Sequence, residues 1–208
     1  MKIGIIGSGH IGGTLTRRLS ALGHEVTVTN SRGPQSLGDL AAETGATAGT
    51  LDEAVQGAEL VVIAIPLKAV PDLPAALFDG KVVVDADNYY PQRDGDIAEL
   101  LDRSLSSSRW TQEHLKGARV VKTFNNIQAA HLMDHGKAAG EAGRIALPVA
   151  GDDADAKRMV MELVDALGFD PVDAGTLDES WRQQPDTPVY GTDRDAEGVR
   201  QGLAEARP

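Results

Sequence analysis

Short apolar runs alternate with amphipathic stretches from the beginning of the chain. Residues 3–6 and 60–65 are almost continuously apolar, which is typical of strands that are buried on both faces. Between them, residues 10–22 carry Leu15 and Leu19 one helical turn apart, which predicts an amphipathic helix. The alternation predicts an α/β fold, in which helices cover both faces of a doubly wound, mainly parallel sheet.

The same periodicities predict elements along the rest of the chain. Further strands are expected at residues 25–29, 47–48, 81–86, 119–124, 145–150 and 171–173, and further helices at residues 36–44, 51–56 and 154–167. The polar stretch after residue 192 is expected to fray or to form a surface helix. We place a domain boundary in the glycine-rich stretch 136–143, between a larger domain of residues 1–143 and a small C-terminal lobe of residues 144–208.

A glycine-rich turn follows the first predicted strand. Gly7, Gly9 and Gly12 match the pattern G-x-G-x-x-G, and the first predicted helix follows directly. In that setting the first glycine permits a tight turn, the second lets the backbone approach a pyrophosphate, and the third lets the helix pack close to the strand. The amino end of the helix offers free N–H groups and a positive dipole end. The turn predicts a dinucleotide site of the Rossmann type, and a purely structural turn is the alternative.

The end of the second predicted strand bears on the choice of nicotinamide cofactor. NAD sites usually carry Asp or Glu there, which holds the ribose hydroxyls. This chain has Asn30, Ser31 and Arg32 instead. Asn30 does not repel a phosphate, Ser31 can donate a hydrogen bond, and Arg32 can pair with a 2′-phosphate. These residues favour NADP over NAD, and an ordinary polar loop is the alternative.

Three further strand ends carry groups that would complete a cleft, because ligands in such folds bind beyond the carboxyl ends of the strands. One strand ends at Ile65 and Pro66 without a charge, so that the backbone can run beside a nucleotide. A polar group that includes Asn88 follows another strand, and Asn125 and Asn126 follow a third. Ordinary loop chemistry is the alternative for each.

Composition and charge exclude several classes of function. The chain of 208 residues has a formal net charge of −11, which disfavours nucleic acid as a partner. Its aromatic content of 4% is too low for a surface that stacks single-stranded bases. The absence of cysteine removes disulfides, thiolate metal sites and cysteine nucleophiles. No apolar run has the length of a membrane span or of a signal peptide, so we expect no membrane partner and a cytoplasmic location.

The sequence presents no clear acid–base or metal constellation. The candidate proton donors are Asp87, Tyr89, Lys122 and His131, and no spacing distinguishes one of them. His131 and His135 are four residues apart, as metal ligands on a helix are, but Leu132 stands where the zinc-protease pattern has Glu. We therefore expect neither a catalytic side chain nor a metal ligand.

A turn-rich segment near the C-terminus, residues 181–190, contains Trp181, Tyr190 and several side-chain amides. One interpretation is a loop that lines or covers the substrate cleft. The other is a surface arm that packs its aromatic side chains on the core or on a second subunit.

Several stretches together resemble the F420-dependent NADP oxidoreductases. The resemblance is carried by GSGHIGG at residues 7–13, NSR at 30–32, AIP at 64–66, VVVDADNYYP at 82–91, VVKTFNNI at 120–127, LPVAGDD at 147–153 and GFDPVDAG at 168–175. It implies a Rossmann-like fold whose small C-terminal lobe closes over the cleft, a homodimer, and hydride transfer between NADP(H) and the deazaflavin coenzyme F420. By position, it implies that NADP(H) is held by Ser8, His10, Ile11, Asn30, Ser31 and Arg32. Ile65 and Pro66 would then lie near the nicotinamide, and Asn125 and Asn126 would border the deazaflavin pocket.

Direct hydride transfer between two stacked rings needs no side-chain nucleophile, because the cofactors carry the chemistry. The related β-hydroxyacid dehydrogenases and imine reductases append a long helical domain, for which the roughly sixty residues after the last Rossmann-like strand are too few. The alternatives are an NADPH-dependent reductase of a flavin, quinone, imine or carbonyl compound, and a non-catalytic sensor that binds NADP(H).

Overall fold

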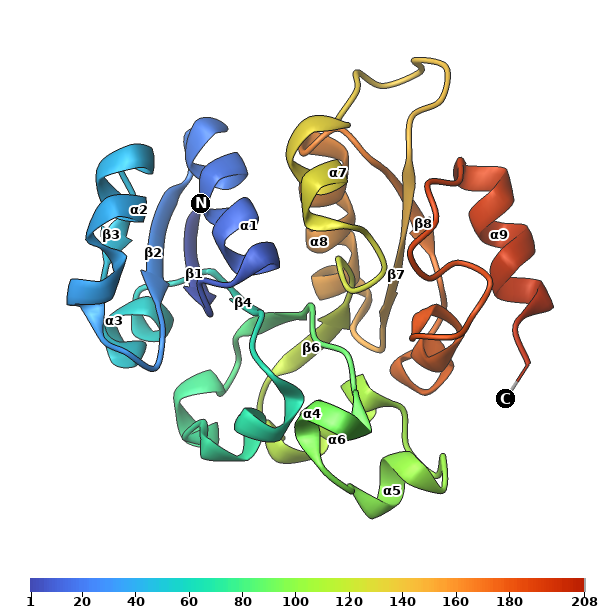
Figure 1. The fold of residues 1–208 in the computed structure, drawn as a ribbon, viewed down its shortest axis with the longest axis horizontal. Helices are drawn as coiled ribbons and strands as arrows, with labels where there is room; N and C mark the ends of the chain where they lie inside the picture. Colours follow the sequence, from blue (N-terminus) through green and yellow to red (C-terminus); the bar gives the residue numbers. More distant parts are fainter. Residues whose placement is uncertain (208) are drawn as a thin grey trace.

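One eight-stranded sheet organises the computed structural model, which describes residues 1–207 (Figure 1). Its strands are β1 (Lys2–Ile6), β2 (Glu25–Thr29), β3 (Thr47–Ala48), β4 (Leu60–Ile63), β5 (Val82–Asp85), β6 (Arg119–Lys122), β7 (Ala146–Gly151) and β8 (Asp170–Asp173). They lie in the order β3-β2-β1-β4-β5-β6-β7-β8. The first six strands are parallel, β7 runs antiparallel to β6, and β8 is parallel to β7.

The strand order reverses between β1 and β4, as it does in dinucleotide-binding Rossmann folds. In such folds the carboxyl ends of the two strands at this point lead into loops on opposite faces of the sheet, and ligands bind in the crevice between them. The sheet order and the alternation of strands with helices confirm the predicted Rossmann-like α/β fold.

Helices cover both faces of the sheet. The α-helices are α1 (His10–Ala21), α2 (Gly38–Thr44), α3 (Leu51–Gln56), α4 (Pro91–Asp94), α5 (Ala98–Leu101), α6 (Ser107–His114), α7 (Ala129–Asp134), α8 (Ala154–Ala166) and α9 (Ala196–Glu205). Four 3₁₀ helices complete the described residues: η1 (Pro34–Leu37), η2 (Leu67–Asp72), η3 (Ala75–Phe78) and η4 (Leu177–Gln183). Figure 1 shows α1, α7 and α8 on one side of the molecule and α4, α5 and α6 on the other.

The apolar run in β4 illustrates why this sheet is buried on both faces. Leu60 and Val62 join the core beneath α1, α7 and α8, whereas Val61 and Ile63 join the core beneath α3, η3 and α6. Successive side chains of a strand point to opposite faces, so a continuous apolar sequence fills both cores.

The C-terminal residues extend the same sheet. Helix α8 connects β7 to β8 and buries Val160, Leu163 and Val164 in the core that α1 also covers. Helix α9 places Val199 and Leu203 against β7 and β8, so the polar stretch after residue 192 forms a helix with one buried face. The boundary predicted at residues 143/144 falls between α7 and β7 and stays a prediction. Within residues 1–207, no helix combines the length and the apolarity that a membrane crossing requires.

Candidate functional site

The glycine turn brings α1 directly onto the end of β1. Gly7 has a φ of 107°, and a Cβ there would lie 2.1 Å from the carbonyl oxygen of Ala64. A Cβ on Gly12 would lie 2.0 Å from the carbonyl oxygen of Gly7. Neither contact is possible for a side chain, so the fold itself requires glycine at these two positions.

The middle glycine of the turn has a different environment. Gly9 has an ordinary φ of −72°, and a Cβ added to it would meet no atom within 4 Å. It is the N-cap residue of α1, and no side chain caps the helix there. The first N–H groups of the helix have no intrahelical acceptor and face this open space. An open, uncapped cradle of this kind fits a pyrophosphate.

Asn30 connects the glycine turn to the residues that follow β2. Its Nδ2 donates to Ser8 Oγ at 2.9 Å and to Ser36 Oγ at 3.0 Å, and its Oδ1 accepts from the backbone N–H of Arg32 at 2.9 Å. Ser31 and Arg32 are exposed, and within residues 1–207 the Arg32 guanidinium forms neither an ion pair nor a hydrogen bond. A free cation on the loop that Asn30 connects to the glycine turn fits the extra phosphate of NADP.

The end of β4 is held by a buried carboxyl group. The N–H of Ile65 donates to Asp87 Oδ1 at 2.8 Å, and Pro66 follows as an exposed residue at the start of η2. The side chain of Ile65 packs on apolar residues of both neighbouring clusters. The backbone at this strand end is therefore fixed in position by the loop that follows β5.

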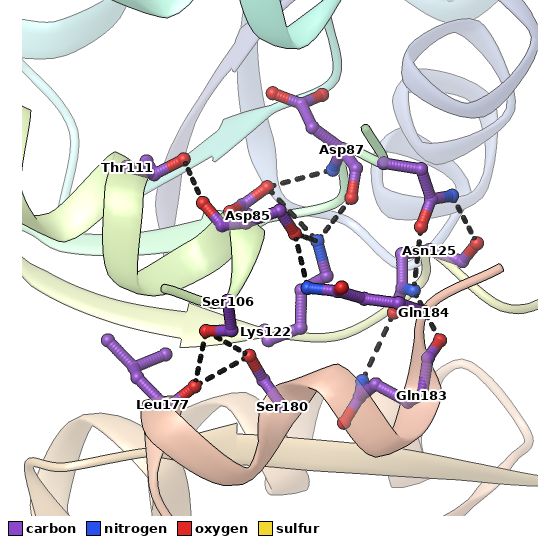
Figure 2. Close-up of polar contacts among 12 residues, drawn as sticks. Asp85, Asp87, Ser106, Thr111, Lys122, Asn125, Leu177, Ser180, Gln183 and Gln184 are labelled. Carbon is purple, nitrogen blue, oxygen red and sulfur yellow. Dashed lines mark hydrogen bonds and ion pairs between the residues drawn. The ribbon is translucent and has the colours of Figure 1, made fainter. Parts of the chain in front are cut away.

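Two carboxyl groups and one ammonium group are buried together beneath this strand end (Figure 2). Lys122 Nζ lies 3.5 Å from Asp85 Oδ1, and both side chains are 0% exposed. The same ammonium donates to the backbone carbonyl of Asp87, and Asp85 Oδ1 accepts from the N–H of Asp87 at 2.8 Å. Burial raises the pKa of the Asp87 carboxyl well above its ordinary value, the Asp85 carboxylate raises it further, and Lys122 lowers it by less. The cluster therefore holds one buried ion pair, Asp85 with Lys122, beside a carboxyl group whose ionised form is disfavoured by burial.

The end of β6 is joined to the C-terminal part of the chain by side-chain amides. Asn125 Nδ2 donates to Asn88 Oδ1 at 3.0 Å and to the carbonyl of Gln183 at 2.7 Å. Gln183 Nε2 donates back to Asn125 Oδ1 at 3.1 Å, and Asn126 Nδ2 donates to the carbonyl of Val189 at 3.3 Å. The backbone of Phe124 has a φ of 62°, which is uncommon for a side chain of this size. These hydrogen bonds therefore hold the backbone after β6 in an uncommon conformation.

The segment 181–190 lies across these strand ends rather than away from them. The hydroxyls of Tyr90 and Tyr190 are in hydrogen-bond contact, and Arg93 stacks over the Tyr90 ring at 4.9 Å. Burial and this contact with Tyr90 both raise the pKa of Tyr190. Beside it, a cavity of about 580 Å³ is lined by residues that include Tyr89, Ser107, Trp181, Gln184 and Thr187.

The structure brings most of the residues expected at the site to one edge of the sheet. Ser8 contacts Asn30 directly, and Asn88 contacts Asn125. His10 is exposed and Ile11 half-buried in the first turn of α1. Two of the candidate proton donors, Asp87 and Lys122, are buried together with Asp85. Tyr89 is bonded to Gly95 and Ile97, and His131 is paired with Asp193 on α7.

Two participants in this arrangement were not singled out from the sequence. Gln183 stands 58 residues from Asn125, and Arg93 donates to the carbonyl of Asn88 at 2.7 Å from a helix that no periodicity indicated. No rule of sequence spacing connects Asn125 with Gln183. Only the amide content of residues 181–190 hinted that this segment contributes polar contacts.

The topology, the glycine cradle and the free cation define a Rossmann-type dinucleotide-binding protein. Residues 2–89 match the family described as NADP oxidoreductase, coenzyme F420-dependent. A hypothetical protein of Sinorhizobium meliloti, SMa0349, superposes with a TM-score of 0.79 at 35% identity, over 93% of this chain and 94% of that one. A protein of Arthrobacter sp. FB24 with the provisional name F420-dependent NADP-reductase superposes with a TM-score of 0.72 at 30% identity, over 88% of this chain and 87% of that one. This chain belongs to the family of F420-dependent NADP oxidoreductases, as its motifs suggested.

A longer relative matches as well. Rat metalloreductase STEAP3 is 31% identical over 179 residues, which cover 85% of this chain and 34% of that protein. The aligned regions span between 24% and 48% of the length of the curated relatives.

A pair of glycine substitutions separates the two roles of the turn. Gly9→Ala should leave the unfolding free energy within about 0.5 kcal/mol of wild type, since open space surrounds the added methyl group. It should weaken NADPH binding by about tenfold or more, because the methyl group occupies the pyrophosphate approach. Gly12→Ala should cost about 1–3 kcal/mol of stability through its clash with Gly7. Urea denaturation and fluorescence titration measure both, and tight NADPH binding by Gly9→Ala would contradict the assignment.

The buried carboxyl predicts an unusual pH dependence of stability. The raised pKa means that Asp87 of the unfolded chain, with an ordinary pKa of about 3.9, ionises at a lower pH than Asp87 of the folded chain. Between the two pKa values the folded chain binds the proton that the unfolded chain has released, so wild type loses up to about 1.4 kcal/mol of stability per pH unit relative to Asp87→Asn. The stability of Asp87→Asn relative to wild type should therefore rise as the pH rises above about 4.

Denaturation curves between pH 4 and pH 8 test this expectation. Asp72→Asn, at an exposed position, is the matched control and should show a flat difference from wild type. A difference for Asp87→Asn that does not change with pH would mean that Asp87 is ionised in the folded protein.

Proposed function

We propose that this protein binds NADP(H) at the amino end of α1 and exchanges a hydride between it and coenzyme F420. The observation that carries the first half is the exposed Arg32 guanidinium, which has no protein partner in residues 1–207 and lies two residues after Asn30, whose side chain bonds Ser8 of the glycine turn. Family membership and the provisional name of the Arthrobacter relative support the second half.

Different residues of the cleft bind different parts of NADP(H). The N–H groups of His10 and Ile11 at the start of α1 receive the pyrophosphate. Ser31 and Arg32 hold the 2′-phosphate, and Asn30 holds the loop that presents them through its bond to the Arg32 N–H. When bound, the nicotinamide donates or accepts the hydride.

The far end of the cleft orients the reacting rings. Ile65 and Pro66 border the nicotinamide, with the Ile65 amide held by Asp87. Asn88 and Asn125 form a rigid floor through their mutual hydrogen bonds, and Asn126 fixes the segment that covers it. Rigid positioning is the contribution that a direct transfer between two cofactors requires of the protein.

The state of the candidate proton donors favours a transfer that needs no side-chain acid. Lys122 is fully buried, and Asp87 is 3% exposed with one oxygen bonded to Ile65. The Tyr89 hydroxyl is engaged by Gly95 and Ile97. Reduction of a carbonyl or imine compound needs a proton donor within reach of the substrate. Exchange with a deazaflavin moves the hydride directly between the two rings, and the one proton that completes the reduction of F420 is taken from solvent.

The C-terminal lobe supports the proposal that a second substrate binds to this protein. Residues 144–208 place Trp181, Gln184 and Thr187 along the cavity of about 580 Å³, which is within the usual range for small-molecule sites. We propose that segment 181–190 contributes to substrate binding and that the lobe closes over the cleft. The homodimer implied by the resemblance stays a prediction.

An absorbance assay tests the reaction. Purified protein with NADPH and oxidised F420 should bleach the deazaflavin band, since reduction removes its conjugation, with NADPH consumed in equal amount. An unchanged spectrum would refute transfer to F420. Parallel assays with a flavin, a quinone, an imine and a carbonyl compound then identify another acceptor, and tight NADPH binding without turnover on the whole panel would indicate a sensor.

Arg32→Ala tests the cofactor preference separately. Loss of a charge-assisted contact of about 1.5–3 kcal/mol should raise the Kd for NADPH by about 10- to 150-fold and leave that for NADH nearly unchanged. Isothermal titration measures both constants. Arg158→Ala, at an exposed site on α8, is the matched control and should bind both as wild type does. Equal weakening of NADPH and NADH by Arg32→Ala would remove Arg32 as the selector.

A further inference from the structure

Two imidazoles and one carboxylate come together on the surface at the carboxyl end of α7. His131 lies in the last turn of that helix, His135 follows it directly, and Asp193 lies in the loop before α9. One ligand atom from each residue lies within 4.8 Å of the other two. Asp193 is 62 residues from His131 in sequence, so only the fold supplies this third group.

The three side chains already face one another. The rings of His131 and His135 stack with their centroids 4.3 Å apart and their planes at 11°. Nδ1 of His131 lies 3.0 Å from Asp193 Oδ1 and 2.8 Å from Oδ2. Ligand atoms around a tetrahedral zinc ion are roughly 3.3 Å apart, given metal–ligand distances near 2.0–2.1 Å. Small rotations of these partly exposed side chains therefore suffice to converge on one ion.

The surroundings favour a cation and leave space for its remaining ligands. A surface pocket of about 430 Å³ borders the cluster and is lined by Asp134, His135, Lys137 and Asp193 among others. The ammonium of Lys137 is engaged by the carbonyl of Ala142 at 2.9 Å. The chain as a whole carries a net charge of −11. Water in the pocket can complete a site that has three protein ligands.

We propose that His131, His135 and Asp193 bind one divalent transition-metal ion of the Zn²⁺, Co²⁺ or Ni²⁺ type. Imidazole nitrogen is a preferred ligand of these ions, whereas Mg²⁺ and Ca²⁺ favour sites built from oxygen. The glutamate that Leu132 replaces in the zinc-protease pattern is a general base and not a ligand, so its absence leaves the two histidines able to bind a metal, and Asp193 supplies a third ligand from another element.

The ion joins α7 to the segment that leads into α9. That segment is already held to the end of β6, because the N–H of Gly191 donates to the carbonyl of Asn126 at 2.8 Å. A metal at Asp193 adds a second attachment a few residues later, so it fastens the C-terminal segment that lies across the strand ends. This inference is independent of the hydride acceptor and of the proposed function.

Titration of untagged protein with Co²⁺, followed by visible absorption, tests the site. Wild type should bind one Co²⁺ per chain with the intense bands of a low-coordinate site, and Zn²⁺ should displace it. His135→Gln and Asp193→Asn should each weaken binding by about tenfold or more. His24→Gln, which removes a half-buried histidine elsewhere, is the matched control and should keep the wild-type affinity. No saturable binding by wild type at micromolar free metal, or equal affinity in His135→Gln, would overturn the site.

Stability supplies a second readout that does not depend on spectroscopy. Zn²⁺ at 100 times its Kd should shift the folding equilibrium of wild type by about 100-fold toward the folded state. The same addition should shift the equilibrium of His135→Gln by no more than about tenfold, because its Kd is about tenfold higher or more, with circular dichroism confirming that the variant is folded. Equal stabilisation of both proteins would place the metal elsewhere and overturn the assignment.

Discussion

The close approach of α1 to β1 is the constraint on which the rest of the site depends. Residues 7 and 12 touch backbone to backbone, where a Cβ on Gly12 would come within 2.0 Å of the Gly7 carbonyl. This contact aims the uncapped amino end of α1 at the point where the strand order reverses. The same turn meets β2 through the bond from Gly7 to Thr29, and Asn30 contacts both Ser8 and the backbone N–H of Arg32. The proposed phosphate site therefore draws on two elements without any charged residue inside the turn.

A second constraint acts at the neighbouring strand ends, where charge is buried. Asp85 and Lys122 sit in register on adjacent strands, and Asp87 follows two residues later. Burial raises the pKa of the Asp87 carboxyl, because a further ionised group in such a place carries a large desolvation cost. The buried groups fix the geometry of the strand ends. Asp87 Oδ1 accepts from the Ile65 N–H, and the Lys122 ammonium donates to the backbone carbonyl of Asp87. The floor of the cleft is therefore rigid, although it offers no exposed acid for chemistry.

The C-terminal residues complete this cleft as part of the same sheet. Asn125 and Asn126 direct their amides to Gln183 and Val189, so both residues that follow β6 hold the covering segment in place. The two tyrosine hydroxyls, and the cluster around His131 and Asp193, attach the same segment at further points. Polar side-chain contacts hold segment 181–190, and Val189 adds apolar packing, because it is buried among residues of β7, β8 and α9.

Local patterns along the chain predicted the alternating strands and helices, the glycine turn and the cationic residues after β2, because each depends on neighbours within one turn or strand. They did not indicate α4, α5 and α6, which are short, weakly periodic and stabilised by packing on the strand ends. They also could not show that β7 runs antiparallel to β6, because strand direction depends on how the connection through α7 packs. The sequence by itself determined which dinucleotide fold forms and where its glycine turn lies. Only the tertiary structure decided which distant side chains meet, such as Asn125 with Gln183 and His131 with Asp193, because contacts between residues about sixty positions apart follow from the packing of whole elements and leave no periodic trace in the chain.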